Sequence, residues 1–197
     1  MKISKNILIP IISLIIIVVG AVVFKMSSQF NPVLDELNKI AEEKPEWTEF
    51  TSRILDLKSQ EVPADKGEAT TYYLNLGLSW KSLADRTLES KHYLKALDAY
   101  TRGIEISDGK NLVFLNNAGN MAMFAKDYEL SKYYFEKSIE NFPGDAEAYV
   151  NLTDILRYNL GASKEEIIAV YDKGIKRLLN PAPLEDRKKG YLNSLEE

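Results

Sequence analysis

Side chains that commonly carry out catalysis or bind metals are scarce in this sequence. Its 197 residues include one histidine and no cysteine, which excludes thiolate nucleophiles, cysteine zinc sites and histidine-rich metal sites. The single histidine, His92, falls in an expected loop and is interpreted as a loop residue rather than as a ligand or a catalytic base. Carboxylates are numerous, but no two of them stand out as an acid and base pair. The sequence therefore predicts a protein that is not an enzyme and that uses no cofactor or metal.

One segment looks like a nucleotide-binding loop, and the charge of the chain bears on nucleic acid. Residues 103–110, GIEISDGK, resemble a phosphate loop, but they hold one residue too many between the glycines, and Asn111 stands where a serine or threonine would hold magnesium. We interpret them as a turn between helices. Residues 26–197 carry 22 basic and 29 acidic residues, a net charge of −7. This negative charge argues against nucleic acid as a partner.

The first 25 residues differ in composition from the rest of the chain. Residues 7–24 read ILIPIISLIIIVVGAVVF and carry no charge; as a helix they would span roughly 27 Å, close to the hydrocarbon thickness of a bilayer. Two interpretations are open, a retained membrane anchor and a cleaved signal peptide. The length of the segment and the lack of a clear small-x-small cleavage site after it favour the anchor. Lys2 and Lys5 favour a cytoplasmic N-terminus, with the rest of the chain outside the cytoplasm.

The spacing of apolar residues predicts helices throughout the remainder of the chain. Apolar residues share one helical face in residues 33–41 and again in residues 47–57, and a polar connection follows at residues 59–69. Three later segments can be aligned with one another, and each fits two helices joined by a turn: residues 70–108, 112–145 and 146–181. The first segment has about seven extra residues between its helices, within residues 84–94.

The three aligned segments share residue types at fixed positions. The eighth position is small or threonine, the twenty-fourth is aromatic and the twenty-seventh is small. In chain order these residues are Gly77, Gly119 and Thr153; Tyr100, Phe135 and Tyr171; and Gly103, Ser138 and Gly174. Small residues let two helices approach to about 8–10 Å. In these features the segments resemble the tetratricopeptide repeat, a helix–turn–helix unit of about 34 residues.

The resemblance implies an all-α fold, a solenoid of three such repeats with capping helices at its ends. An N-terminal tail (1–6) and a transmembrane helix (7–24) would precede it, followed by juxtamembrane and N-terminal capping helices (25–69). The repeats would occupy 70–108, with an insertion at 84–94, then 112–145 and 146–181. Residues 182–197 would form a C-terminal capping helix with Leu184, Tyr191, Leu192 and Leu195 on one side.

The resemblance also implies a binding surface, because the first helix of each tetratricopeptide unit lines the concave side of the array. Polar side chains at the corresponding positions are the candidate partner-binding residues: Asn75, Lys81, Asn116, Asn117, Asn120, Asn151, Asp154 and Arg157. Asparagine amides donate and accept hydrogen bonds, so a row of them can hold the main chain of an extended peptide. The sequence is equally compatible with a packing role between repeats for the asparagines at the sixth position.

These features lead us to expect a membrane-anchored scaffold that docks a peptide or helix of a partner protein, in envelope assembly, secretion or quality control. A basic clamp for a C-terminal carboxylate is disfavoured, because Glu147 and Asp154 would repel that carboxylate. The alternatives are a structural protein that associates with itself and a docking receptor that faces the cytosol. A homo-oligomer is compatible with each of these functions.

Overall fold

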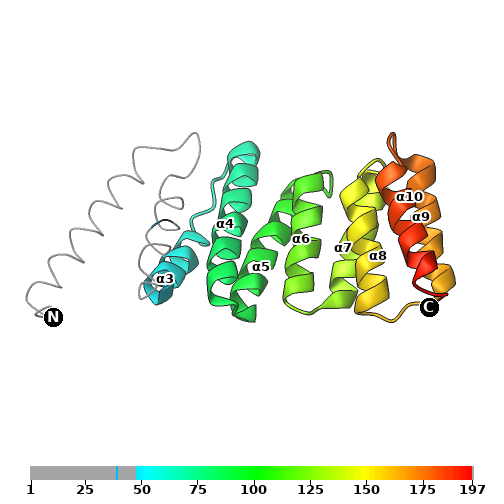
Figure 1. Ribbon diagram of the computed structural model, residues 1–197. Helices are drawn as coiled ribbons and strands as arrows, with labels where there is room; N and C mark the ends of the chain where they lie inside the picture. The colour runs from blue at the N-terminus through cyan, green and yellow to red at the C-terminus, as the bar shows by residue number, and fades with distance from the viewer. Residues whose placement is uncertain (1–38, 40–47, 197) are drawn as a thin grey trace, which may run out of the picture.

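The computed structural model describes Lys39 and residues 48–196, and the regular elements in that part are all α-helices. Helices that follow one another in the sequence lie side by side in a single row (Figure 1). In chain order they are α3 (Thr48–Lys58), α4 (Lys66–Thr87), α5 (Ser90–Ile106), α6 (Leu112–Phe124), α7 (Tyr128–Asn141), α8 (Ala146–Tyr158), α9 (Lys164–Arg177) and α10 (Ala182–Asn193). The all-α fold class expected from the sequence is confirmed for the described part.

Polar side chains set where several of these helices begin. The Asp65 carboxylate accepts a hydrogen bond from the backbone N–H of Glu68 at 2.9 Å, and the Ser163 hydroxyl accepts one from Glu166 at 3.1 Å. Asn111, Asp127 and Asp145 cap α6, α7 and α8 in the same way. These caps satisfy backbone donors that the first turn of a helix leaves unpaired, and so fix each helix start.

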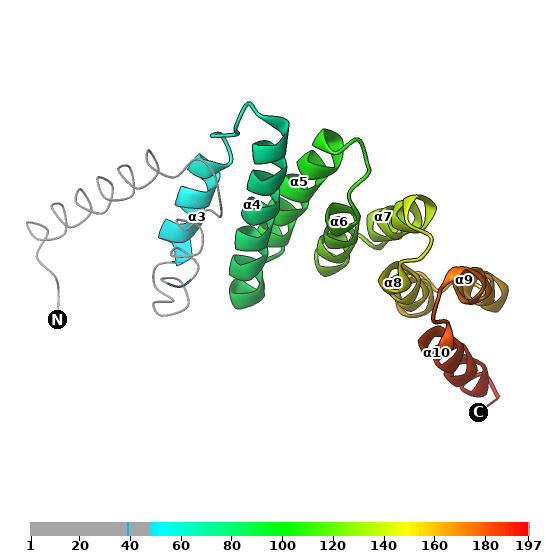
Figure 2. The same ribbon diagram turned by 90° about the horizontal axis from the view of Figure 1, so that it is seen from above.

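The row of helices is curved. Figure 2 shows α4, α6, α8 and α10 along the inner side of the curve, and α5, α7 and α9 along its outer side. Buried apolar side chains fill the row in two clusters, one over α3 to α7 and one over α7 to α10. The inner helices are therefore the elements that position any surface on the concave side.

Two glycines on outer helices let side chains of the next inner helix reach the backbone. A Cβ atom at Gly103 would lie 2.3 Å from the ring of Phe114, and one at Gly174 would lie 2.4 Å from Leu184. Phe114 and Leu184 are each 1% exposed, and each is the third residue of its helix. Helix α10 therefore packs on α9 in the way that α6 packs on α5, and it continues the row.

The two ends of the described row are covered by α3 and α10. Leu55 of α3 is fully buried, and the Lys95 ammonium of α5 pairs with the Asp56 carboxylate of α3 at 2.7 Å. At the other end Leu184 and Tyr191 of α10 are buried. Leu195 was expected on the same side, but it follows the end of α10 and is 46% exposed. That part of the prediction is wrong, because the helix stops before Leu195 can turn towards α9.

The expected insertion at 84–94 is not a long loop. Its residues extend α4 to Thr87 and begin α5 at Ser90, so the two helices are longer than their counterparts. Leu88 makes the turn in the left-handed conformation, with φ 55°, a conformation in which glycine is usual. The interpretation of His92 as a loop residue is also wrong, because His92 lies in α5 and is 2% exposed.

Two expectations about the N-terminal part fall mostly outside the described residues. In Lys39 and residues 48–196, no helix has the length and apolar character needed to cross a bilayer. The uncharged segment 7–24 is not in this part of the chain. The helix expected over residues 33–41 is likewise outside it, apart from Lys39, whereas the helix expected over residues 47–57 corresponds to α3.

Candidate functional site

One stripe of side chains on each of α4, α6 and α8 faces solvent. The stripe on α6 consists of Val113, Asn117, Asn120 and Phe124, which are spaced three or four residues apart and are all exposed or half-buried. The equivalent stripes on α4 and α8 have the same spacing. We call the three stripes together the inner face: Thr71, Asn75, Leu78, Ser82, Val113, Asn117, Asn120, Phe124, Glu147, Asn151, Asp154 and Tyr158.

Amide groups connect α6 to α8 on the inner face. The Asn151 Nδ2 donates to the Asn120 Oδ1 at 3.3 Å, and the Asn120 Nδ2 donates to the Glu147 Oε1 at 3.5 Å. Both distances are longer than those of good amide hydrogen bonds. Each amide also has donors and acceptors beyond these two bonds. These two candidate residues are thus brought together by the fold, in contacts that a ligand can replace.

Two other candidate residues contact the last helix. The Arg187 Nη1 of α10 donates to both carboxylate oxygens of Asp154, each at 3.1 Å. The Arg157 Nη2 donates to the Ser194 hydroxyl at 3.0 Å, and its guanidinium lies 5.0 Å from the ring centroid of Tyr191. Asp154 and Arg157 therefore help to hold α10 against α8, and they form the border of the inner face.

Asn116 does not belong to the inner face. It is 8% exposed, and its Nδ2 donates to the Asp145 carboxylate at 2.8 Å. Its Oδ1 accepts from the Ser138 hydroxyl at 2.7 Å. Because Asp145 caps α8 and Ser138 lies on α7, Asn116 joins three helices from inside the row. Its expected role as a surface residue is corrected to a packing role, since it lies one residue away from the solvent-facing stripe.

The remaining candidates are spread along the row. The Lys81 ammonium pairs with the Asp85 carboxylate on its own helix at 2.5 Å, and the Asn117 Nδ2 donates to the Val113 carbonyl at 2.9 Å. Asn75 is half-buried on α4. Neither Lys81 nor Asn117 uses its polar group to join two helices in these contacts. The side-chain amides of Asn75 and Asn117 thus lie on the solvent-facing stripes of α4 and α6.

The candidate residues predicted from the sequence are all polar, and they leave out the apolar residues of the inner face. Leu78, Val113, Phe124 and Tyr158 are 45%, 49%, 43% and 66% exposed. They stand at the second, ninth and thirteenth positions of their repeats, on the same solvent-facing stripes as the selected asparagines, so the repeat register alone could have found them. Exposed apolar side chains that gather on one surface indicate an interaction site more strongly than scattered ones do.

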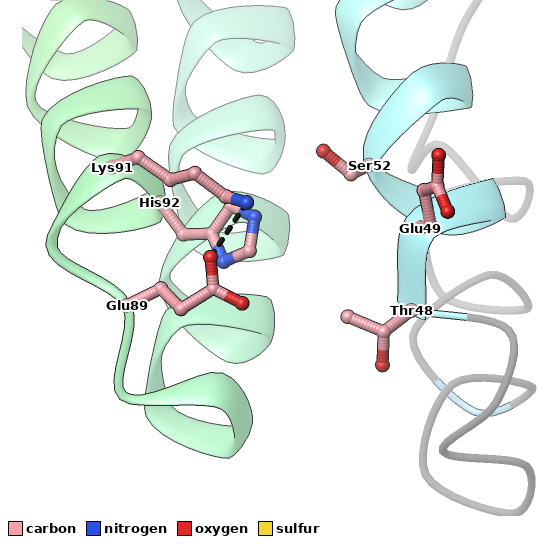
Figure 3. Close-up of a pocket in the computed structure, with 6 residues that line it drawn as sticks. All are labelled: Thr48, Glu49, Ser52, Glu89, Lys91 and His92. Atoms are coloured by element: carbon pink, nitrogen blue, oxygen red, sulfur yellow. Dashed lines mark ion pairs between the residues drawn. The ribbon is translucent and has the colours of Figure 1, made fainter.

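A separate pocket lies between α3 and the start of α5. It has a volume of about 410 Å³, and Figure 3 shows Thr48, Glu49 and Ser52 on one side, facing Glu89, Lys91 and His92 on the other. The Lys91 ammonium pairs with the Glu89 carboxylate at 2.6 Å. The hydrogen bonds and ion pairs described for these six residues do not join a nucleophile to a base.

The His92 ring is held between a hydroxyl and an aromatic side chain. Its Nδ1 lies 2.7 Å from the Thr87 hydroxyl, which is also 3.0 Å from the Leu83 carbonyl. The Nε2 atom is buried and has no hydrogen-bond partner among the residues that the structure describes. The ring also stacks on Trp80, with ring centroids 5.8 Å apart.

We expect acid to destabilise the fold through His92. Burial lowers the pKa of His92. The charge of Lys91 lowers it as well, whereas the charges of Glu89 and Asp56 raise it. Below about pH 6.5 the unfolded chain binds a proton that the folded ring does not, so stability present above this pH is lost as the pH falls. Urea unfolding of the full chain at about pH 7.5 and about pH 5.5 measures this loss. His92→Phe, which keeps an aromatic ring beside Trp80, should show a smaller loss of stability. Equal losses in the two chains would contradict His92 as the cause.

The described residues contain no cluster of side chains suited to binding a metal ion. No group of three or more histidine, aspartate or glutamate side chains in Lys39 and residues 48–196 is arranged to hold an ion.

Comparison with known proteins found no family model and no curated protein that matches the chain. The function is therefore inferred from the inner face itself.

Proposed function

We propose that the chain is a membrane-anchored scaffold of the tetratricopeptide type, with an inner face that docks a peptide or helix of a partner protein. Three helix pairs, α4–α5, α6–α7 and α8–α9, would be the repeats, and α10 would be the terminal cap. The observation that carries the proposal is the inner face: solvent-facing amide and apolar side chains continue over three successive helices on the concave side of the row. Folds of this kind use such extended surfaces for binding.

The chemistry of the inner face fits a peptide ligand. The long amide contacts among Asn120, Asn151 and Glu147 can exchange for bonds to the N–H and C=O groups of a bound main chain. Neighbouring apolar side chains can bury those of the ligand. A single helix pair offers few such groups, so affinity would come from several repeats acting together.

The N-terminal segment would determine where docking occurs. A helix over residues 7–24 would hold the scaffold at a membrane, with the N-terminus cytoplasmic and the repeats outside the cytoplasm. Tethering raises the effective concentration of the scaffold near other membrane proteins, so that weak docking suffices. No enzyme activity, cofactor or nucleic acid enters this proposal.

The self-association alternative is less well supported. End-to-end stacking of two arrays needs an apolar surface at the end of the row. The outward side of α10 instead carries exposed charged residues, among them Glu185, Asp186 and Lys189. Removing this charge from water at an interface between two copies would oppose association.

Photo-crosslinking in cells tests the proposed surface. A photoreactive amino acid at Asn120, on the inner face, should link the full-length chain to a partner protein, whereas the same amino acid at Glu136, exposed on α7, should not. The double variant Asn120→Ala, Asn151→Ala should weaken partner capture about thirtyfold, since two hydrogen bonds are worth about 1 kcal/mol each.

A matched pair on the outer side gives the control. Glu136→Ala with Lys173→Ala removes two exposed polar side chains from α7 and α9 and should leave capture unchanged. Circular dichroism of each purified variant checks that the helices remain folded. Equal capture by the inner-face and outer-face variants would rule out the inner face as the docking surface.

A further inference from the structure

The contacts between inner helices follow one rule along the row. On α6, Asn120 contacts Glu147 and Asn151 of α8; on α8, Asp154 contacts Arg187 of α10. Asn120 and Leu78 are equivalent, because each directly follows a glycine that an aromatic ring packs against: Gly119 with Phe135, and Gly77 with Tyr100. In the same register Val113 and Asn117 of α6 are equivalent to Glu147 and Asn151 of α8, so the rule predicts that Leu78 of α4 faces them.

The junction between α4 and α6 is thus apolar where the later junctions are polar. The α6–α8 junction has amides and a carboxylate, and the α8–α10 junction has an ion pair. At the α4–α6 junction, Leu78 is 45% exposed and Val113 is 49% exposed. Leaving these two aliphatic side chains in water loses the stabilisation that burying them would give. This pair is available for burial by a ligand.

The stripes on α4 and α6 carry no charged residue, and several of the charges around the inner face are paired within the chain. Lys81 pairs with Asp85, and Asp154 pairs with Arg187. The Arg157 guanidinium lies over the rings of Tyr158 and Tyr191, at 4.8 Å and 5.0 Å from their centroids, and Glu147 accepts from Asn120. A charged ligand would have to compete with these pairs, whereas an uncharged one would not.

We propose that the first half of the inner face, Leu78 and Val113 with Asn117 and Asn120, binds an uncharged peptide segment through its aliphatic or aromatic side chains. The asparagine amides bind the main chain of that segment. This inference rests on the proposed docking function and adds the class of ligand and its place. A bilayer fits the surface less well, because α4 and α6, which carry the pair, lie on the concave side of the row (Figure 2), and the amides on their solvent-facing stripes are half-buried.

Selection from a random peptide library displayed on phage tests this inference. The full-length chain in lipid nanodiscs is the bait, and the displayed peptides have about 12 residues, enough to cross two inner helices. The selected peptides should be rich in apolar residues and close to neutral. Their affinity, measured with synthetic copies, should change less than about twofold between about 0.05 M and 0.5 M salt.

Two variants locate the binding. Leu78→Asn with Val113→Thr should weaken the selected peptides at least about tenfold, the loss expected when two aliphatic side chains no longer contribute. Leu94→Asn changes a leucine of similar exposure, 51%, on the outer helix α5, and should have no effect. All substituted side chains are exposed, and circular dichroism confirms that each variant is folded.

The other outcomes separate this inference from the docking function. Peptides that are charged and sensitive to salt, or that bind the Leu78 and Val113 variant as tightly as the unchanged chain, overturn the inference. If such peptides still depend on Asn120 and Asn151, docking on the inner face survives. A selection that depends on neither pair overturns both. Dimers in sedimentation that disappear in the Leu78 and Val113 variant would make a second copy the ligand and also overturn the inference.

Discussion

Gly103→Ala is expected to lower the free energy of unfolding by about 2 kcal/mol. The new Cβ atom would lie 2.3 Å and 2.4 Å from two atoms of the Phe114 ring, and that ring is buried between α5 and α6 with 1% exposure. Forcing extra atoms into a packed core costs about 1–3 kcal/mol. The ring has little freedom to move, so the upper part of that range applies, and the roughly 1 kcal/mol that alanine gains over glycine in a helix offsets part of it.

Gly190→Ala is the matched control for this prediction. Gly190 is also inside a helix, α10, but no atom lies within 4 Å of the place where its Cβ would be. This substitution should raise the free energy of unfolding by up to about 1 kcal/mol. Urea unfolding of the full chain in detergent, followed by circular dichroism, measures both. Equal effects of the two substitutions would contradict the close approach of α5 and α6.

The close approach at Gly103 belongs to the part of the fold that the sequence could predict. Apolar periodicity marks the helices, and the small twenty-seventh position repeats in Gly103, Ser138 and Gly174. Both partners of the contact lie in neighbouring helices at fixed offsets, so local pattern and register are sufficient to find it. The same reasoning located the solvent-facing stripe that contains Asn117 and Asn120.

The departures have two kinds of reason, one local and one that depends on residues distant in the sequence. At the turn between α4 and α5, Leu88 adopts the left-handed conformation in which glycine is usual. The turn therefore has no glycine or proline to mark it in the sequence. Without that signal the repeat alignment predicts extra residues between the two helices and places buried His92 in a loop. The burial of Asn116 depends on Ser138 and Asp145, which are 22 and 29 residues away, so register alone did not separate it from Asn117.

Asn116→Ala is expected to lower the free energy of unfolding by about 2 kcal/mol. The substitution removes the donor at 2.8 Å from the Asp145 carboxylate and the acceptor at 2.7 Å from the Ser138 hydroxyl. A hydrogen bond to a charged group contributes about 1.5–3 kcal/mol, and a buried group left without its partner loses stability further. Asp145 keeps its bonds to the start of α8, which limits the loss. Thermal and urea unfolding of the full chain measure the change.

Asn117→Ala separates packing from binding at the neighbouring position. Asn117 is half-buried on the solvent-facing stripe and donates to a carbonyl of its own helix, so its removal should change the free energy of unfolding by less than about 0.5 kcal/mol. The proposed docking predicts the reverse order for peptide affinity, with Asn117→Ala weakening it and Asn116→Ala leaving it unchanged at temperatures where the variant is folded. A large loss of stability from both substitutions would mean that the asparagines of α6 serve packing alone, and the amide part of the inner face would no longer support docking.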